Sequence, residues 1–381
     1  MINLSLDDSG RHHRQELITW WDQQKLKSSK VLVVGAGAIG NEVVKNLVLV
    51  GVGSIDVCDM DTIENSNLSR CVFFREEDLG RFKSEILVER ARELDNEIAL
   101  RSFIEPVQRV GIGRLSDYDL IIGALDNREA RAWVNQACRK LGKAWIDGAI
   151  EGLRGIVRYF AAEGPCYACT LTEADYKQMS HRRSCALLAP EDLLEGKTPT
   201  NATTASLVAA VQVQEAIKAL VGREDLLALK GACWVYVGDT MTAYVTKYSA
   251  DPDCLAHDFY DQVHTSSESI ETLAELVNLA QNSSLISDVS ALDFEEDLVT
   301  VYPCPDHGQN SVTKVRSALG LGAARCSVCQ RDLLGEIQSS VSQNHEIVAG
   351  QIKNLGFAQS DIITLRSGNQ RVHFKLGAPN G

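Results

Sequence analysis

Apolar residues gather in two short runs near the start of the chain. The first run, residues 31–34, leads into a segment with the 3.6-residue period of a helix, and the second covers residues 54–58. Short apolar runs of this kind are typical of strands buried on both faces of a parallel sheet. The pattern predicts a strand–helix–strand unit, the start of a Rossmann-like, doubly wound and mostly parallel α/β sheet.

Later segments predict further elements, some in the same domain and the rest in a second one. We expect a helix over 205–220, an acidic strand over 293–302 and a hairpin over 362–366 and 371–376. Residues 265–268, Thr-Ser-Ser-Glu, form a capping-box pattern before a helix with one apolar face, made by Ile270, Leu273, Val277 and Ala280. The chain is therefore predicted to contain a domain over residues 1–264 and a small α+β extension over residues 265–381.

A glycine motif made by Gly35, Gly37 and Gly40 joins the first strand to its helix. Glycines at this spacing allow a tight turn and the close approach of a phosphate, and the helix N-terminus attracts the anion. The second strand ends at Asp59, 19 residues after Gly40, where an acidic residue would meet ribose hydroxyls. These residues predict a nucleotide site, but they also fit any dinucleotide dehydrogenase, and a glycine turn that binds nothing is the plain alternative.

Further motifs separate these interpretations. The run DMDTIENSNLSR extends from Asp59 to Arg70, Lys83 follows it, DNREAR begins at Asp126, and RHHRQ begins at Arg11. In order and spacing these elements resemble the ThiF/MoeB/ubiquitin-activating superfamily over roughly residues 11–258. The combination is far more specific than any one of its motifs.

The resemblance implies an enzyme that uses ATP to adenylate the C-terminal carboxylate of a ubiquitin-like or sulfur-carrier protein. Because a carboxylate must attack a phosphate against anion repulsion, catalysis depends on positioning and on fixed cations. By resemblance, Arg70 and Lys83 supply these cations, Asp126 holds Mg²⁺, Asp59 binds the ribose, and Asn67 positions phosphate oxygens. The expected nucleotide-binding residues are Gly35, Gly37, Ala38, Gly40, Asp59, Asp61, Asn67, Arg70, Lys83, Asp126 and Asn127.

The N-terminal motif and two departures from the family pattern add to this picture. In the family an arginine at the position of Arg14 reaches the ATP of the neighbouring subunit, so Arg14 implies a homodimer. Ala38 stands where many relatives carry a further glycine, and Cys71 replaces a glutamine. Taken singly, Arg70 and Lys83 would be ordinary surface cations, and only the shared order of motifs gives them a catalytic role.

Cysteine spacing predicts two zinc sites. Two pairs of residues can each present two ligands on one tight turn: Cys166 with Cys169, and Cys254 with His257. The resemblance joins these pairs into one structural Cys₃His site. In the extension, a pair made by Cys304 and His307 is followed by 18 residues and then by a pair made by Cys326 and Cys329. This spacing matches a second four-ligand zinc site, with unliganded residues as the alternative in both cases.

Cys185 is the candidate nucleophile. Relatives that form covalent intermediates place a reactive cysteine in the segment before the 205–220 helix, and Cys185 is the cysteine there outside the zinc pairs. His181, Arg182 and Arg183 beside it would favour the thiolate, which could attack the acyl-adenylate to give a thioester. A small buried residue without chemistry is the plain alternative.

Charge and composition exclude some classes of protein and indicate a cellular compartment. A net charge of −13 argues against a broad nucleic-acid surface, and neither a membrane-spanning run nor a signal segment is visible. We therefore expect a cytoplasmic, reducing compartment, in which the 11 cysteines are metal ligands, nucleophiles or packing residues rather than disulfides.

The leading hypothesis is a compact, bacterial-style enzyme that activates a ubiquitin-like protein and passes it from Cys185 to a conjugating enzyme. The alternative enzyme adenylates a sulfur carrier, or modifies a short peptide, without a conjugation cascade. An inactive scaffold and a nicotinamide oxidoreductase are disfavoured by the complete set of Arg70, Lys83, Asp59 and Asp126. We expect the extension to dock the modifier protein or a conjugating enzyme.

Overall fold

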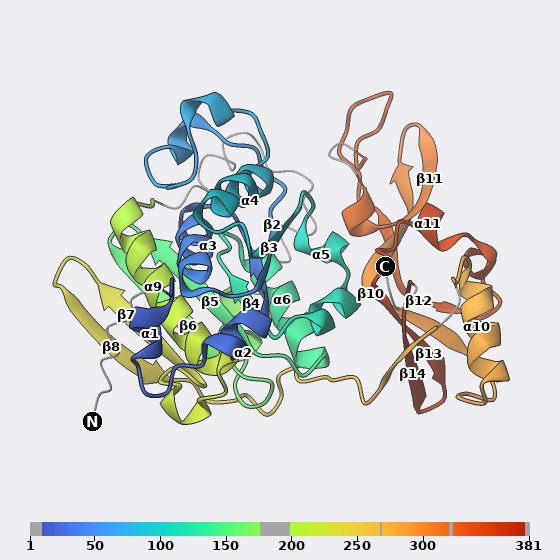
Figure 1. Cartoon of the computed structure of the whole chain (residues 1–381). Helices are drawn as coiled ribbons and strands as arrows, with labels where there is room; N and C mark the ends of the chain where they lie inside the picture. Colours follow the sequence, from blue (N-terminus) through green and yellow to red (C-terminus); the bar gives the residue numbers. More distant parts are fainter. Residues whose placement is uncertain (1–9, 176–198, 267–268, 320–322, 378–381) are drawn as a thin grey trace. The chain divides into compact units, whose positions relative to one another are not determined.

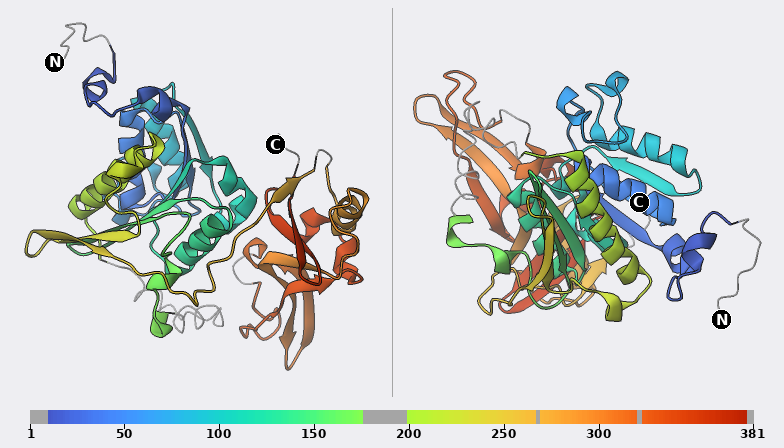
Figure 2. Two further views of the ribbon diagram at one scale, coloured as in Figure 1. Left: turned by 90° about the horizontal axis from the view of Figure 1, so that it is seen from below. Right: turned by 90° about the vertical axis from the view of Figure 1, so that its left-hand side faces the viewer.

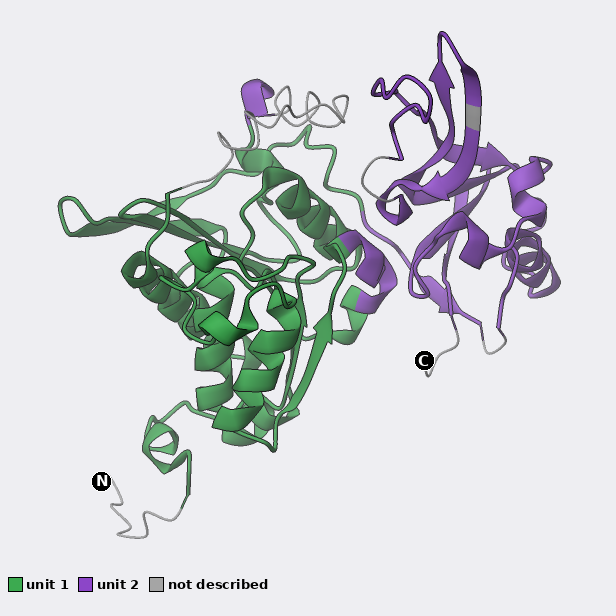
Figure 3. Cartoon of the chain, turned by 90° about the horizontal axis from the view of Figure 1, so that it is seen from above, with its two compact units in different colours: residues 1–107, 115–171, 198–258 green, residues 108–114, 172–197, 259–381 purple. Residues whose placement is uncertain are grey.

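The computed structural model describes residues 10–175, 199–266, 269–319 and 323–377 of the 381-residue chain (Figure 1). The chain divides into two compact units (Figure 3). Unit 1 contains Met1–Val107, Leu115–Leu171 and Thr198–Asp258, and unit 2 contains Gln108–Arg114, Thr172–Lys197 and Phe259–Gly381. The domain boundary expected at residue 264 stays a prediction.

The described residues of unit 1 form an eight-stranded sheet with the order β3-β2-β1-β4-β5-β6-β7-β8. The parallel strands are β1 (Lys30–Val34), β2 (Ser54–Cys58), β3 (Ala99–Phe103), β4 (Leu120–Gly123) and β5 (Trp145–Glu151). An antiparallel extension follows, made by β6 (Arg154–Phe160), β7 (Ala232–Val237) and β8 (Thr242–Lys247). The predicted mostly parallel α/β sheet is confirmed, and the two apolar runs are β1 and β2.

Helices cover this sheet on both faces (Figures 1 and 2). The strand order, with the usual right-handed crossovers, puts α3 (Ala38–Val50) and α4 (Lys83–Leu94) on one face and α6 (Arg128–Lys140) on the other. On the first face, α9 (Ala202–Leu220) packs beside α3. Alternate residues of β1, such as Val31 and Val33, are fully buried against these helices. The carboxyl ends of β1, β2 and β4 are thereby held by a continuous core.

The helix expected over 205–220 is confirmed as α9, which begins slightly earlier because the side chain of Asn201 caps it by accepting the N–H of Thr204. Three short helices also occur, α1 (His13–Glu16), α2 (Gln23–Ser28) and α5 (Val107–Val110), and Leu26 of α2 is fully buried in the core. Within the ranges that the structure describes, no helix combines the length and the apolar character needed to cross a bilayer.

Unit 2 contains a mainly antiparallel, six-stranded sheet in its described part, with the order β11-β10-β13-β14-β9 and with β12 paired to β10. Its elements are β9 (Val263–Thr265), α10 (Leu273–Asn282), β10 (Ala291–Cys304), β11 (Gly308–Val315), β12 (Glu336–Ser342), α11 (Ile352–Leu355), β13 (Ile362–Ser367) and β14 (Gln370–Lys375). The predicted acidic strand and hairpin are confirmed as β10 and as β13 with β14. A core formed by α10 and the sheet makes this an α+β unit.

The predicted capping box at the start of the extension is wrong in position. Thr265 belongs to β9, which pairs in parallel with β14, and Glu268 lies outside the described residues. The capping box is formed instead by Thr272 and Glu275, and the helix begins at Leu273. The sequence offers both Thr-x-x-Glu patterns, and strand pairing by Thr265 excludes the first.

Candidate functional site

The predicted nucleotide site lies where the strand order reverses, since β1 has β2 on one side and β4 on the other. Doubly wound sheets bind ligands at such switch points. A Cβ atom at Gly40 would lie 2.0 Å from the carbonyl oxygen of Gly35, and one at Gly35, whose φ is +105°, would lie 2.3 Å from that of Ala124. A Cβ at Gly37 would meet nothing within 4 Å. Gly35 and Gly40 therefore leave no room for a side chain, whereas the space beside Gly37 is free of protein atoms.

Asn41 is a positioning residue that sequence analysis did not select. Its side chain is fully buried, and Nδ2 donates to the carbonyl oxygens of Ala36 at 2.9 Å and Gly37 at 3.1 Å. Oδ1 accepts the N–H of Phe73 at 3.1 Å. One side chain thus ties the glycine turn to the loop that carries Arg70. The sequence could have indicated this role, because Asn41 is a polar residue on the side of the first turn of α3 that faces the core.

Asp59 directly follows β2, and one of its carboxylate oxygens holds the glycine turn while the other holds the loop that follows. Oδ2 accepts the N–H of Ala36 at 2.7 Å, and Oδ1 accepts the N–H of Asp61 at 2.8 Å. Burial raises the pKa of Asp59, against the lowering effect of these donors and of Lys83. Each oxygen of the carboxylate still has a lone pair for a ligand hydroxyl, so the arrangement fits the expected ribose contact.

Lys83, the first residue of α4, lies among carboxylates. Its Nζ is 2.8 Å from Oδ2 of Asp61, and its side chain is 13% exposed. Burial opposes the charge, but the hydrogen bond to Asp61 and the fields of Asp59, Asp61 and Asp126 outweigh it and raise the pKa of Lys83. The structure therefore brings together these members of the predicted site, which are far apart in the sequence.

Asn67 and Arg70 stabilise their own loop. Oδ1 of the buried Asn67 accepts the N–H of Glu64 at 2.9 Å, completing a capping box around the 3₁₀ turn Asn65–Asn67. The guanidinium of Arg70 donates to the carbonyl oxygen of Ser66. Cys71, the departure from the family pattern, is buried in the apolar core. The loop is thus ordered by its own contacts, in addition to Asn41.

Asp126 is exposed at the start of the loop after β4, and its neighbours hold it there. Oδ1 of Asn127 accepts the N–H of Ala130 at 2.7 Å and caps α6, while its Nδ2 donates to Oδ1 of Asp126 at 3.3 Å. Arg131, on the same helix, donates to the carbonyl oxygen of Leu125. Asn127 and Arg131 therefore have structural roles that position Asp126.

Arg14 lies away from the glycine turn of its own chain. It is exposed on α1, and α1 contacts the C-terminal end of α3, because Nε2 of Gln15 donates to the carbonyl oxygen of Leu49 at 3.3 Å. The glycine turn is at the other end of α3, about 20 Å away for a helix of this length. Arg11 is also remote, since its guanidinium pairs with Asp95. The structure does not bring Arg14 to the nucleotide site of the same chain.

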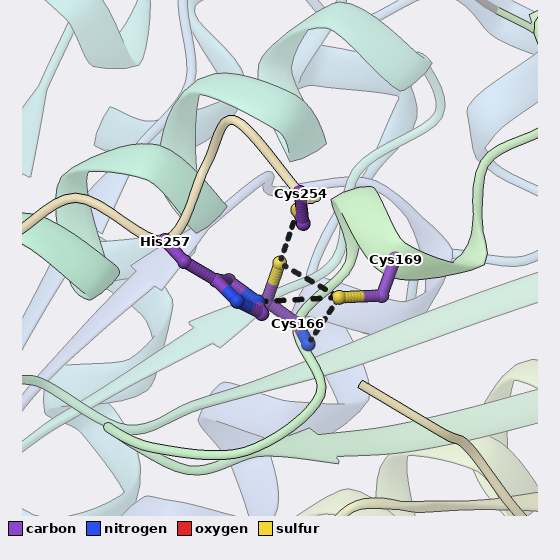
Figure 4. A group of neighbouring side chains, drawn as sticks. All are labelled: Cys166, Cys169, Cys254 and His257. Carbon is purple, nitrogen blue, oxygen red and sulfur yellow. Dashed lines mark hydrogen bonds between the residues drawn. The ribbon is translucent and has the colours of Figure 1, made fainter. Parts of the chain in front are cut away.

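The first zinc prediction corresponds to a cluster of Cys166, Cys169, Cys254 and His257 (Figure 4). The Sγ atom of Cys166 is 3.7 Å from those of Cys169 and Cys254, and Sγ of Cys169 is 3.2 Å from Nε2 of His257. Tetrahedral bonds of about 2.3 Å to zinc would place two sulfurs about 3.8 Å apart. The donor set and its spacing therefore fit a four-ligand zinc ion.

A second cluster occurs in unit 2 and joins Cys304, His307, Cys326 and Cys329. Sγ of Cys304 lies 3.8 Å from that of Cys329 and 3.5 Å from Nδ1 of His307, and Sγ of Cys326 lies 3.7 Å from the same nitrogen. These separations also fit tetrahedral zinc. A small separate core packs beside the cluster, formed by Val299, Tyr302 and Leu333 with two of the cysteines.

The remaining cysteines divide in two groups. Cys185, the predicted nucleophile, lies outside the described residues. Cys58, Cys71, Cys138 and Cys233 are buried, and burial raises the pKa of each thiol, to about 11 for Cys71. A raised pKa disfavours the nucleophilic thiolate, so these four are packing residues, as expected from the sequence.

Comparison with known proteins agrees with this geometry. The ThiF family profile matches residues 10–256, so the chain belongs to the ThiF family. It is 32% identical over 260 residues to the SAMP-activating enzyme E1 of Haloferax volcanii, a match that covers 65% of this chain and 87% of that one. It is 30% identical over 259 residues to the Bacillus subtilis sulfur carrier protein ThiS adenylyltransferase, covering 66% and 73%.

Solved structures extend the comparison to the fold. A crystal structure of Escherichia coli MccB with AMPCPP and MccA has a TM-score of 0.55 and 24% identity, covering 67% of this chain and 76% of that one. This likeness shows the fold of unit 1. Two fungal relatives are longer, and the chain spans 40% and 51% of their length. The family match ends at residue 256, just before Phe259, where the C-terminal segment of unit 2 begins.

Replacement of Asn41 tests its positioning role. Asn41→Ala leaves two carbonyl groups and one N–H without their partner, so we expect a loss of about 1–3 kcal/mol in the free energy of unfolding, measured with urea. ATP binding should weaken in the same variant. Asn354→Ala, at an exposed asparagine, should change stability by less than about 0.5 kcal/mol. Equal effects of the two changes would contradict the assignment.

Metal analysis tests the two clusters. The purified chain should contain about two zinc ions by mass spectrometry, because each cluster supplies four ligands. Cys254→Ser and Cys326→Ser should each lose about one of them, whereas Cys233→Ala, at a buried cysteine outside both clusters, should retain both. A wild-type content of one zinc would show that one cluster does not bind metal.

Proposed function

We propose that this chain is an adenylyltransferase that uses ATP to activate the C-terminal carboxylate of a small sulfur-carrier or ubiquitin-like protein. The convergence of the glycine turn with Asp59, Lys83 and Asp126 at one switch point of the sheet carries this proposal. Membership of the ThiF family and the names of the archaeal and bacterial relatives support it.

In this reaction a carboxylate oxygen of the carrier attacks the α-phosphorus of ATP. The bond between that phosphorus and the pyrophosphate oxygen breaks, which gives an acyl-adenylate and pyrophosphate. The glycine turn and the N-terminus of α3 bind phosphate, Asp59 binds the ribose, and Asn67 orients phosphate oxygens. Lys83 and Arg70 balance the growing negative charge. The raised pKa of Lys83 keeps its side chain protonated. Asp126 would hold Mg²⁺, which neutralises phosphate charge.

A homodimer forms part of the proposal. Arg14 is too far from the nucleotide site of its own chain and would act on that of a second copy. Apolar side chains beside it, at Leu17, Ile18 and Leu49, are 39%, 41% and 51% exposed. A partner subunit over this end of α1 and α3 would cover them and bring Arg14 to its target.

Thioester formation on Cys185 is the second candidate function. The Haloferax volcanii relative, of which this chain covers 87%, is named an activating enzyme E1. Six cysteines belong to the two metal clusters and four others are buried, so Cys185 remains as the cysteine available for acyl transfer. In this version the thiolate attacks the acyl-adenylate carbonyl and releases AMP, and unit 2 docks the carrier protein or a conjugating enzyme.

Pyrophosphate exchange tests the adenylation step. The full chain, supplied with Mg·ATP and a small ubiquitin-fold protein that ends in glycine, should exchange labelled pyrophosphate into ATP. Arg70→Ala and Asp126→Ala should each reduce the rate at least about 100-fold, since the first removes a cation proposed to contact the reacting phosphates and the second removes the proposed ligand of Mg²⁺. Arg90→Ala, at a half-buried arginine on the same helix as Lys83 that pairs with Asp78 and Glu93 rather than with the predicted site, should leave it unchanged. Full exchange in the first two variants would contradict the proposed nucleotide site.

A non-reducing gel distinguishes the two candidate functions. With Mg·ATP and the carrier, a covalent adduct that thiol treatment reverses should form if Cys185 accepts the acyl group. Cys185→Ala should abolish the adduct while pyrophosphate exchange continues. An adduct that persists in Cys185→Ala would reject this nucleophile. Exchange without any adduct in the wild type would support adenylation alone.

A further inference from the structure

A buried group of three charges lies between the first metal cluster and the loop of Asp126. The carboxylate of Asp147, on β5, is fully buried. Its Oδ1 accepts a hydrogen bond from Nε of Arg131 at 2.9 Å, and its Oδ2 forms an ion pair with Arg158 at 2.7 Å. The two arginine side chains are only 9% and 14% exposed. Such a carboxylate is strongly held, because its removal would leave two buried cations without their partner.

On one side this group reaches the nucleotide site. Arg131 lies on α6 and donates from Nη2 to the carbonyl oxygens of Leu125 and Gly148, the latter at 3.2 Å. Leu125 directly precedes Asp126. The position of Asp147 therefore fixes the guanidinium that holds the loop of the expected magnesium ligand.

On the other side it reaches the metal cluster. The guanidinium of Arg158 lies over the ring of Tyr167, 5.1 Å from the ring centre, and Tyr167 stands between the ligands Cys166 and Cys169. The N–H of Tyr167 donates to Oδ1 of the buried Asn135 at 2.8 Å. Asn135 is also on α6, so the cysteine turn is attached twice to the elements that hold the Asp126 loop.

Close packing restricts the movement of Tyr167, which lies between these contacts. The ring of Tyr167 is 3% exposed and meets the edges of Trp145 and Phe160 at centre distances of 6.2 and 6.3 Å. Close-packed interiors transmit small displacements because no void absorbs them. A movement of the cysteine turn must therefore shift Arg158 and its partner Asp147.

We propose that Asp147 is a positioning residue that couples the first metal site to the nucleotide site, so that metal at Cys166 and Cys169 and Mg·nucleotide at Asp126 stabilise each other. This inference rests on the proposed function, since it needs both ligands to bind. Linkage between two sites is reciprocal: if metal strengthens nucleotide binding, nucleotide must strengthen metal binding by the same factor.

The wild-type chain offers a direct test. Zinc transfer from the full chain to a chromogenic chelator is followed with and without Mg²⁺ and the non-hydrolysable analogue α,β-methylene-ATP. Nucleotide should slow release from the first site at least about fivefold. Release from the second site, identified as the phase lost in Cys329→Ser, should not change. Tight nucleotide binding without any slowing would overturn the coupling and leave the proposed function intact, whereas the absence of nucleotide binding would overturn both.

Variants then assign the coupling to Asp147. In Asp147→Asn and Arg158→Gln, nucleotide should no longer change the rate of zinc release, a ratio of about onefold. Both variants should also need a higher Mg²⁺ concentration for half-maximal pyrophosphate exchange. Arg158→Lys, which keeps the charge next to Asp147, should restore part of both. Arg101→Met, which breaks a similar pair with the buried Asp56 elsewhere in the sheet, should leave both readouts at wild-type values. Wild-type coupling in folded Asp147→Asn and Arg158→Gln would exclude this role.

Discussion

The close contact between the glycine turn and the loop after β4 is the constraint on which the rest of the nucleotide site depends. At Gly35 and Gly40 the backbones of β1, α3 and the Ala124 region approach so closely that no side chain fits between them. This contact aims the start of α3 at the carboxyl edge of the sheet and sets the Asp126 loop beside it. Asn41 and Asp59 then hold the turn from two sides with side-chain hydrogen bonds.

Charge at this edge is balanced locally in spite of the acidic chain. Asp59, Asp61 and Asp126 surround Lys83 and keep it protonated, and a fully buried Asp147 is shared by Arg131 and Arg158. Buried charges of this kind are stable only when paired and hydrogen-bonded. The net charge of −13 therefore does not exclude a phosphate site, because only the charges close to that site act strongly on a bound phosphate.

Each unit contains a Cys/His cluster that brings together segments distant in the sequence. Cys254 and His257 follow the last strand of unit 1 and lie beside the turn at Cys166 and Cys169, so zinc bound there would attach the end of that unit to its sheet. In unit 2 the corresponding cluster lies next to a small separate core. Four ligands that meet at one point can hold such segments where the apolar area is small.

Much of this protein was determined by local sequence. Apolar runs identified β1 and β2, the spacing of Gly35, Gly37 and Gly40 identified the turn, and cysteine spacing identified the Cys/His cluster of unit 2, because these signals act between residues close in the chain. Tertiary structure alone decided that Asn41 joins the turn to the Arg70 loop, that Arg14 lies at the far end of α3, and that α10 begins at Leu273. It also decided that Asp147 lies between the metal cluster and the Asp126 loop. Such contacts join residues far apart in the chain, and a buried polar group takes its role from whichever partners the packing brings to it.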